Sequence, residues 1–472
     1  MRRRDTCVPA PCLPGRPWRR ALATGGAGSG GSGTVLRWPS VTTVPRAWLA
    51  AGLAGCALFG GGVVLFSGDS LHRLWGAAAA VSYALAALAV MAWRSRATAG
   101  VDGALGVMIC GAILVPLLWM VWTGHGEPEV GVVANSARTL IRHGTPYKSP
   151  RVLAATTDPN AYNPYLPLMA VFGLPQAVFG SGPLTDPRVW FGTVFLVVFA
   201  FALKAAQARD VVRWALLFTA SPVIAFELCV GGDDVPMVAF MCLGFALLWR
   251  EAVPAAHPLR GDHPVLRRAA AVRAALPTSP VAAGLALGVA SSMKATAWPA
   301  LAVAFSLLAA RDGRRAAWRF AAVALAVVAA IVGPFAVLRP GALVKNTILF
   351  PLGLASVKSQ AASPLLGHVL AQTGVVGHTA VVIMLVGSGL AIAVSLVVRP
   401  PADVPAATAR LVLGLSAMFV LAPSTRFGYF IYPAAMVLWL LVSIAGRRAA
   451  ERERLAGPAA GAPPGVVAAA GG

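Results

Sequence analysis

The sequence predicts an all-α polytopic membrane protein with about twelve transmembrane helices. Of its 472 residues, 58% are hydrophobic and only 12% are charged, whereas soluble domains carry roughly 25% charged residues. Apolar runs of about 20 residues, the length that crosses a bilayer as a helix, recur along most of the chain. Spans are expected near 48–67, 74–93, 103–122, 189–207, 211–229, 235–250, 280–294, 297–310, 316–337, 378–398, 411–423 and 428–446.

The net charge of +22 can indicate either nucleic-acid binding or membrane orientation. Most of the 39 Lys and Arg residues fall in alternate segments between the spans, together with the two ends of the chain. Cytoplasmic loops of membrane proteins collect Lys and Arg in this way. The pattern therefore predicts a multi-pass protein of the cell membrane with both termini cytoplasmic, and it argues against nucleic acid as a partner.

Residues 280–310 offer little length for two spans, yet the charge pattern favours two short helices there. A single span would invert everything downstream and move more basic residues outside than inside. The break is expected near the stretch MKATAWP, where Pro299 is compatible with a helix start.

These spans divide the chain into four parts. Residues 1–47 are expected to form a disordered basic cytoplasmic tail, and 48–100 two accessory transmembrane helices. Residues 101–446 form the transmembrane core, with two large extracytoplasmic loops at 123–188 and 338–377. Residues 447–472 are expected to form a second disordered cytoplasmic tail.

The sequence carries no motif that assigns a cofactor. The six cysteines form no CxxC or Cys/His cluster of the kind that binds a metal. No strand followed by GxGxxG, the mark of a dinucleotide-binding domain, is found either. Asp233 and Asp234 are suited to bind either a divalent cation through oxygen or the hydroxyl groups of a substrate.

Unusual polar residues converge on the side opposite the basic segments. In a membrane protein a charge is costly to place, so acids and bases at several helix ends on one face indicate a site at the outer surface. The residues are Glu127 and Glu129 after the third span, Tyr165, Asp233 and Asp234 in ELCVGGDDVP, Lys294, Lys345, and Arg426 in APSTRFGY.

Each of these residues also has an ordinary explanation. An acid just after a span, such as Glu127 or Glu129, often marks the water boundary. Lys294 can extend along its apolar stem toward the interface, and Tyr165 can anchor the chain at the headgroups. Glu227 lies within a span and is expected to face protein or a wet cavity.

The order of motifs resembles a known family. Glu129 is followed by ANSARTLIRHGTPY and YNPYLP, and later by GGDDVPMVAFMCLGFALLWRE and VAAGLALGVASSMKATAWPAL. Across residues 101–445 this is similar to the integral-membrane glycosyltransferases of the C-type fold. More narrowly, it is similar to glycosyltransferase family 87, the polyprenyl-phosphate-mannose-dependent mannosyltransferases.

The resemblance implies transfer of mannose, or another hexose, from a polyprenyl-phosphate donor to a glycolipid or glycan acceptor at the outer face. The general base would be Glu129, where the family more usually has Asp, with Glu127 as the alternative base. A base takes the proton of the attacking hydroxyl, and cations stabilise the leaving phosphate. Asp233, Asp234, Lys294, Arg426, Tyr165 and Lys345 are the expected substrate contacts.

Two other classes remain as alternatives. A multi-pass transporter or flippase of a lipid-linked or small anionic substrate would also use buried charge, although transporters show internal repeats and binding sites at the membrane midplane. A non-catalytic partner in envelope assembly would fit if Glu in place of Asp means lost catalysis.

Overall fold

The computed structural model describes residues 45–92, 97–208, 210–249, 279–357 and 359–456. The described residues are helical, with one isolated β-bridge and no strand. Of the tails expected at 1–47 and 447–472, residues 1–44 and 457–472 lie outside the described residues, as does the basic segment at 250–278. The described ends of these tails are helical, because α1 starts at Arg46 and α20 continues to Ala456. The long helices are α1 (Arg46–Phe66), α2 (Ser70–Ala92), α8 (Pro187–Ala205), α15 (Arg314–Leu338), α18 (Val375–Val398), α19 (Val404–Leu421) and α20 (Ile431–Ala456). Helices α3 (Ala97–Met108) and α4 (Val115–Trp122) are joined by a π-helical segment, Ile109–Leu114, and form one further long span, Gly100–Trp122.

A second set of helices is shorter and still apolar. It comprises α9 (Val211–Thr219), α10 (Pro222–Val230), α11 (Val235–Leu247), α13 (Pro280–Met293) and α14 (Trp298–Arg311). Backbone groups inside a bilayer must satisfy one another, and a helix does so within one segment. Long apolar runs therefore fold as helices wherever they are lipid-exposed.

The predicted all-α polytopic class is confirmed. Each of the twelve expected segments is helical, and eight helices of the described chain are long and apolar enough to cross a membrane. Helices α9 and α10 form a ninth candidate span that bends by 57°. Helices α11, α13 and α14 have 13, 14 and 14 residues. Twelve crossings therefore stay a prediction, although the helix break after Met293 and the helix start at Trp298–Pro299 are as expected.

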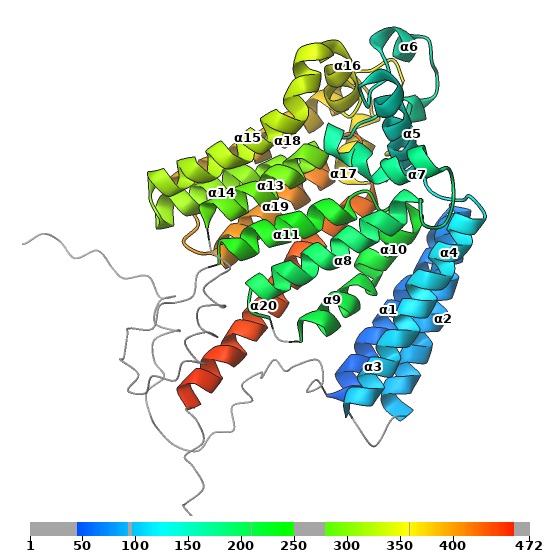
Figure 1. Ribbon diagram of the computed structural model, residues 1–472, viewed down its shortest axis with the longest axis vertical. Coiled ribbons are helices and arrows are strands. Elements are labelled where there is room, and N and C mark those ends of the chain that lie inside the picture. Colours follow the sequence, from blue (N-terminus) through cyan, green and yellow to red (C-terminus); the bar gives the residue numbers. More distant parts are fainter. Residues whose placement is uncertain (1–44, 93–96, 209, 250–278, 358, 457–472) are drawn as a thin grey trace, which may run out of the picture. The chain divides into compact units, whose positions relative to one another are not determined.

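The N-terminal pair α1–α2 is packed into the rest of the fold. Helix α2 contacts α1, α3 and α10, and in Figure 1 α1 and α2 run beside the continuous helix formed by α3 and α4. Buried Trp75 donates to the carbonyl of Ala112 at 2.9 Å, and buried Tyr83 donates to the carbonyl of Ala220. These contacts fix the upper end of α2, which carries His72.

The crossing of α1 and α2 depends on two glycines that allow close backbone approach. A Cβ on Gly76 would lie 2.7 Å from the carbonyl oxygen of Gly60. We expect Gly76→Val to lower the free energy of unfolding by about 1–3 kcal/mol because it overpacks this contact. Thermal unfolding of the purified protein in detergent measures the effect. Gly61→Val is the matched control, since a Cβ there meets nothing within 4 Å; equal midpoints for both variants would contradict the prediction.

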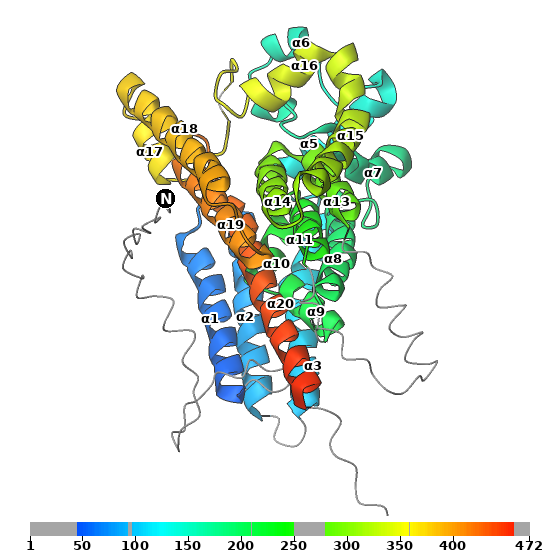
Figure 2. The ribbon, with the colours of Figure 1, turned by 90° about the vertical axis from the view of Figure 1, so that its left-hand side faces the viewer.

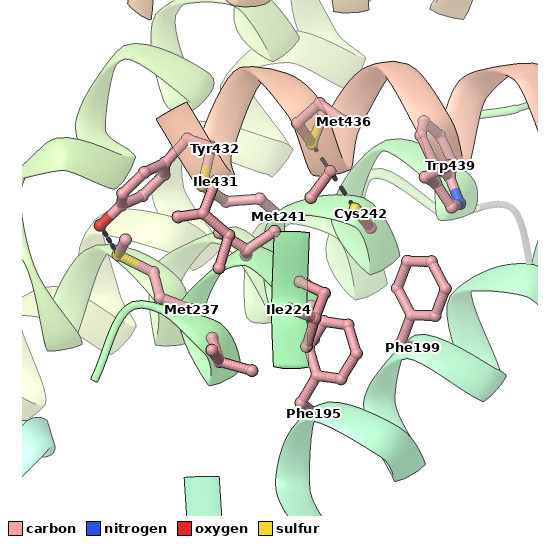
Figure 3. Close-up of a cluster of buried hydrophobic side chains, with 14 of the residues drawn as sticks. Phe195, Phe199, Ile224, Met237, Met241, Cys242, Ile431, Tyr432, Met436 and Trp439 are labelled. Carbon is pink, nitrogen blue, oxygen red and sulfur yellow. Dashed lines mark hydrogen bonds between the residues drawn. The ribbon is translucent and has the colours of Figure 1, made fainter. Parts of the chain in front are cut away.

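A hydrophobic core joins α8, α10, α11 and α20 beneath the polar site. Figure 3 shows Phe195 and Phe199 of α8 facing Ile224 of α10 and the methionines of α11 and α20. Trp439 and Tyr432 of α20 are fully buried in the same cluster. Burial of these large side chains fixes the rotation of α20, and so sets where Tyr432 presents its hydroxyl group.

The two large loops contain short helices that lie at one end of the described bundle in Figures 1 and 2. The first loop holds α5 (Pro128–His143), α6 (Pro150–Ala154) and α7 (Leu174–Phe179), and the second holds α16 (Pro340–Val344) and α17 (Leu366–Ala371). Two small apolar clusters tie the loops together. In one, Tyr147 packs against Ala342 and Leu343; in the other, Tyr162 stacks on Phe350.

Candidate functional site

Glu127 and Glu129 are placed by the first turn of α5. Glu127 is the residue before the helix, Pro128 occupies the first turn, and Glu129 lies in that turn. The positive end of the helix dipole favours a carboxylate at this place. The backbone N–H of Glu127 donates to the carbonyl of Val230 at 2.8 Å, so the start of α5 is fixed to the end of α10. The helix stops at His143 because Gly144 adopts a left-handed φ of 68°.

Arg426 joins the two glutamates. Its guanidinium donates to Oε2 of Glu127 at 3.2 Å and lies 2.7 Å from Oε1 of Glu129. The residue before it is fixed to the second loop: the backbone N–H of Thr425 donates to the carbonyl of Ala361, and Ser363 donates back to Thr425. Arg426 and Glu127, which are 299 positions apart in sequence, therefore meet because the backbone of Thr425 is hydrogen-bonded to Ala361 and Ser363.

The second part of the site is a buried ion-paired group. The ammonium of Lys294 lies 3.1 Å from Oδ2 of Asp233 and 2.5 Å from Oδ1 of Asp234. The hydroxyl of Tyr432 also donates to Asp234. All three charged side chains are at most 12% exposed. Lys294 occupies the break between α13 and α14, and the aspartates occupy the turn between α10 and α11, so all three charges come from helix ends.

The Gly-Gly pair before the aspartates gives the turn its shape. Gly232 has a φ of 75°, a region that residues with a side chain rarely adopt. A Cβ on Gly231 would lie 3.1 Å from Oε2 of Glu127. Gly231 therefore keeps the space in which Glu127 sits beside the aspartate turn, and it brings the two halves of the site together.

Tyr165 forms one wall of the site. Its ring centre lies 5.3 Å from Nζ of Lys294, and the ring of Tyr429 lies 5.2 Å from the same atom on another side. Such distances allow a cation–π attraction. The backbone N–H of Leu166 donates to the carbonyl of Met293 at 2.8 Å. The YNPYLP stretch is thus fixed beside Lys294 by its own backbone.

Glu129 is the acid best suited to exchange a proton near neutral pH. Burial raises the pKa of Glu129 to about 7 against the lowering effect of Arg426, and the charges of Glu127 and Asp233 add to the rise. Its Oε2 atom is buried and has no hydrogen-bond partner among the described residues. A hydroxyl group entering the site would supply that missing hydrogen bond.

Arg426 stays charged in this setting. Burial alone would lower the pKa of Arg426, but the carboxylates of Glu129 and Glu127 outweigh burial and raise it. Guanidinium has five N–H donors and ammonium has three. The contacts with the acids leave further N–H donors on Arg426 and Lys294, which suit a phosphate.

The structure therefore brings together seven of the eight residues predicted from sequence. The exception is Lys345, at the end of α16, whose ammonium donates to the carbonyl of Pro150 at 3.3 Å. Lys345 has no contact with the network around Glu129 among the described residues. Glu227 of α10 lies against Gly428, where its carboxylate leaves no room for a Cβ. It faces protein next to the Arg426 segment, as expected.

Three residues of the site were not predicted. They are His72, which contacts Glu127 at 2.8 Å, Tyr429 and Tyr432. The two tyrosines lie three residues apart after Arg426, a spacing that puts them on neighbouring positions of one helix face. That spacing was the available signal for the tyrosines. His72 had none, because a histidine near the start of a helix is common and its contact with Glu127 arises only in the folded chain.

Comparison with known proteins adds little. No protein-family model matches the chain, and no curated protein matches it. Among solved structures, it is similar to ArnT from Cupriavidus metallidurans in the apo state, with a TM-score of 0.40 and 18% identity. The match covers 70% of this chain, which spans 58% of the length of ArnT. A likeness of this size identifies neither a family nor an activity, so the function has to come from the site.

Proposed function

We propose that the protein is a membrane glycosyltransferase that moves a hexose, with mannose as the first candidate, from a polyprenyl-phosphate donor to a glycolipid or glycan acceptor. The observation that carries the proposal is the contact of Glu129 with Arg426 beside the Lys294–aspartate group. A proton acceptor and two cations for a phosphate then lie together at the ends of membrane helices. Sugar choice rests on the resemblance to family 87 alone.

Each group has one role in this reaction. Glu129 takes the proton of the acceptor hydroxyl while that oxygen attacks the anomeric carbon. The bond from the anomeric carbon to the phosphate oxygen breaks, and the electron pair leaves on the lipid phosphate. Arg426 and Lys294 stabilise the charge that develops there through donors not used by the acids. Asp233, Asp234 and Tyr165 line the place where sugar hydroxyls would bind.

The site is proposed to face away from the cytoplasm. The alternation of basic segments in the sequence supports this, because the positive-inside pattern is expected to put those segments in the cytoplasm and the two long loops on the other side. Both termini are then cytoplasmic, and the lipid-linked donor reaches the site from the outer leaflet of the cell membrane.

The direct test is an assay of purified protein in detergent with polyprenyl-phosphate-mannose and a lipid extract. Mass spectrometry of the products should show a lipid or glycan heavier by one hexose and free polyprenyl phosphate. Transfer of a different hexose from its own polyprenyl-phosphate donor would change only the assignment of the sugar. Absence of any product, together with counterflow uptake in proteoliposomes, would favour a transporter instead.

The transfer rate is expected to rise with pH through about 7, because only ionised Glu129 can accept the proton. Below that value the ionised fraction falls roughly tenfold per pH unit, so the rate at pH 6 should be about one tenth of its plateau. Values of kcat/KM for the donor between pH 5.5 and 8.5, which report ionisation in the free protein, test this. A rate that does not change over that range would show that Glu129 is not the group that titrates.

A further inference from the structure

The hairpin between α1 and α2 reaches the candidate site through a single side chain. His72 lies in the first turn of α2, and its Nε2 is 2.8 Å from Oε1 of Glu127. The two side chains are 25% and 18% exposed, so the contact is largely sheltered from water. The α1–α2 pair precedes residue 101, where the resemblance to family 87 begins.

The hydrogen bonds around His72 have a consistent direction. The ionised carboxylate of Glu127 can only accept a hydrogen bond, so Nε2 of His72 donates to it, and Nδ1 of the neutral ring accepts from the Ser67 hydroxyl at 3.1 Å. The backbone N–H of Asp69 donates to Oγ of Ser67 and holds that side chain in place. A neutral imidazole whose Nδ1 accepts carries its proton on Nε2. That proton points at Glu127, so the turn SGDSLH fixes His72 as a donor to the carboxylate.

The contact continues to the proton acceptor. Glu127 uses Oε1 for His72 and Oε2 for Arg426, and Arg426 in turn contacts Glu129. The carboxylate of Glu127 already accepts a hydrogen bond from His72, so it attracts Arg426 less strongly. The guanidinium of Arg426 can then also pair with Glu129. We propose that His72 is a positioning residue that holds Glu127 and, through Arg426, orients Glu129 for proton transfer; this rests on the proposed function.

The proposal gives α1 and α2 a part in the reaction. Without His72, Glu127 would draw Arg426 toward itself, and Glu129 would lose part of its cation. The charged groups that face Glu129 are Arg426, Glu127 and Asp233. A weaker ion pair between Arg426 and Glu129 raises the pKa of Glu129, so a smaller fraction of Glu129 is ionised at neutral pH.

Two substitutions of His72 separate positioning from packing. His72→Phe keeps an aromatic ring beside Phe226, whose ring centre lies 4.9 Å away, but removes both nitrogens. His72→Gln keeps an N–H near the place of Nε2. His125→Phe is the matched control, because His125 lies two residues before Glu127, is exposed and stacks on Trp119 instead.

The first readout is the rate of transfer as a function of pH. For His72→Phe we expect the rising limb to move up by about one pH unit and the rate at pH 7 to fall about fivefold. His72→Gln should stay within about twofold of the unmodified protein, and His125→Phe should not differ. Equal losses in both His72 variants with an unmoved limb would show a packing role and overturn the proposal.

The second readout needs no turnover. A carbodiimide with a small amine couples to a carboxylic acid in its protonated form, and mass spectrometry reports coupling at Glu129 across pH. The midpoint should rise in His72→Phe and not in His72→Gln; an unmoved midpoint would overturn the proposal even if transfer itself is absent. Should the phenylalanine variant fail to fold, His72→Asn, whose side chain is too short to reach Glu127, takes its place.

Discussion

Replacing Glu129 with glutamine is expected to lower the transfer rate by about a thousandfold, because a positioned general base contributes roughly 10²–10⁴-fold. Glutamine keeps the size of the side chain and an oxygen for Arg426, which lies 2.7 Å from Oε1 of Glu129. Binding of polyprenyl phosphate should therefore persist. Rates with labelled donor and binding by equilibrium titration give the two quantities.

Asp158→Asn is the matched control for Glu129→Gln. Asp158 is an acid of the same loop, exposed and used only to cap a short turn through the N–H of Asn160. Its rate should match that of the unmodified protein. Unchanged turnover in Glu129→Gln would reject Glu129 as the base, and a large loss in Glu127→Gln alone would transfer the role to Glu127.

Replacing Lys294 with methionine is expected to destabilise the protein by about 3–5 kcal/mol, because it leaves two buried aspartates without their cation. Asp233 and Asp234 are 10% and 6% exposed, and both contact Lys294. The midpoint of thermal unfolding in detergent measures the loss. Arg213→Ala is the control: its pair with Asp102 is exposed, so the midpoint of thermal unfolding should stay close to that of the unmodified protein.

A triple variant separates folding from function at the same place. Lys294→Met combined with Asp233→Asn and Asp234→Asn removes the charges together, which restores most of the stability. Transfer should stay lost because the phosphate has lost a cation. Recovery of transfer along with stability would show that the buried pair only holds the helix ends together.

Periodicity and composition were sufficient to locate the helices. Apolar runs must be helical in a bilayer, so all twelve expected segments are helices, and the break before Trp298 follows from Lys294 and Pro299. Composition cannot give the bend between α9 and α10, which lies at the Ser221–Pro222 step, or the shortness of α11. Whether such short helices cross the membrane depends on what packs around them.

The candidate site was predictable only where its residues are costly to place. Lys294 and the aspartates stand out because charge next to an apolar helix requires a partner, and their pairing follows. His72 and Tyr432 do not stand out, since either residue is common at a helix end or in a core. Lys345 looked similar to Lys294 in sequence, but its ammonium contacts a carbonyl of the first loop. Only the tertiary structure shows that Lys294 belongs to the candidate site and Lys345 does not.

The most direct test of the account is the structure of Glu129→Gln with intact polyprenyl-phosphate-mannose bound. The account predicts the donor phosphate against Arg426 or Lys294, with the anomeric carbon facing the side chain at position 129. A donor phosphate bound away from both cations, for example beside Lys345 and Pro150, would contradict the assignment of this cluster as the place of sugar transfer.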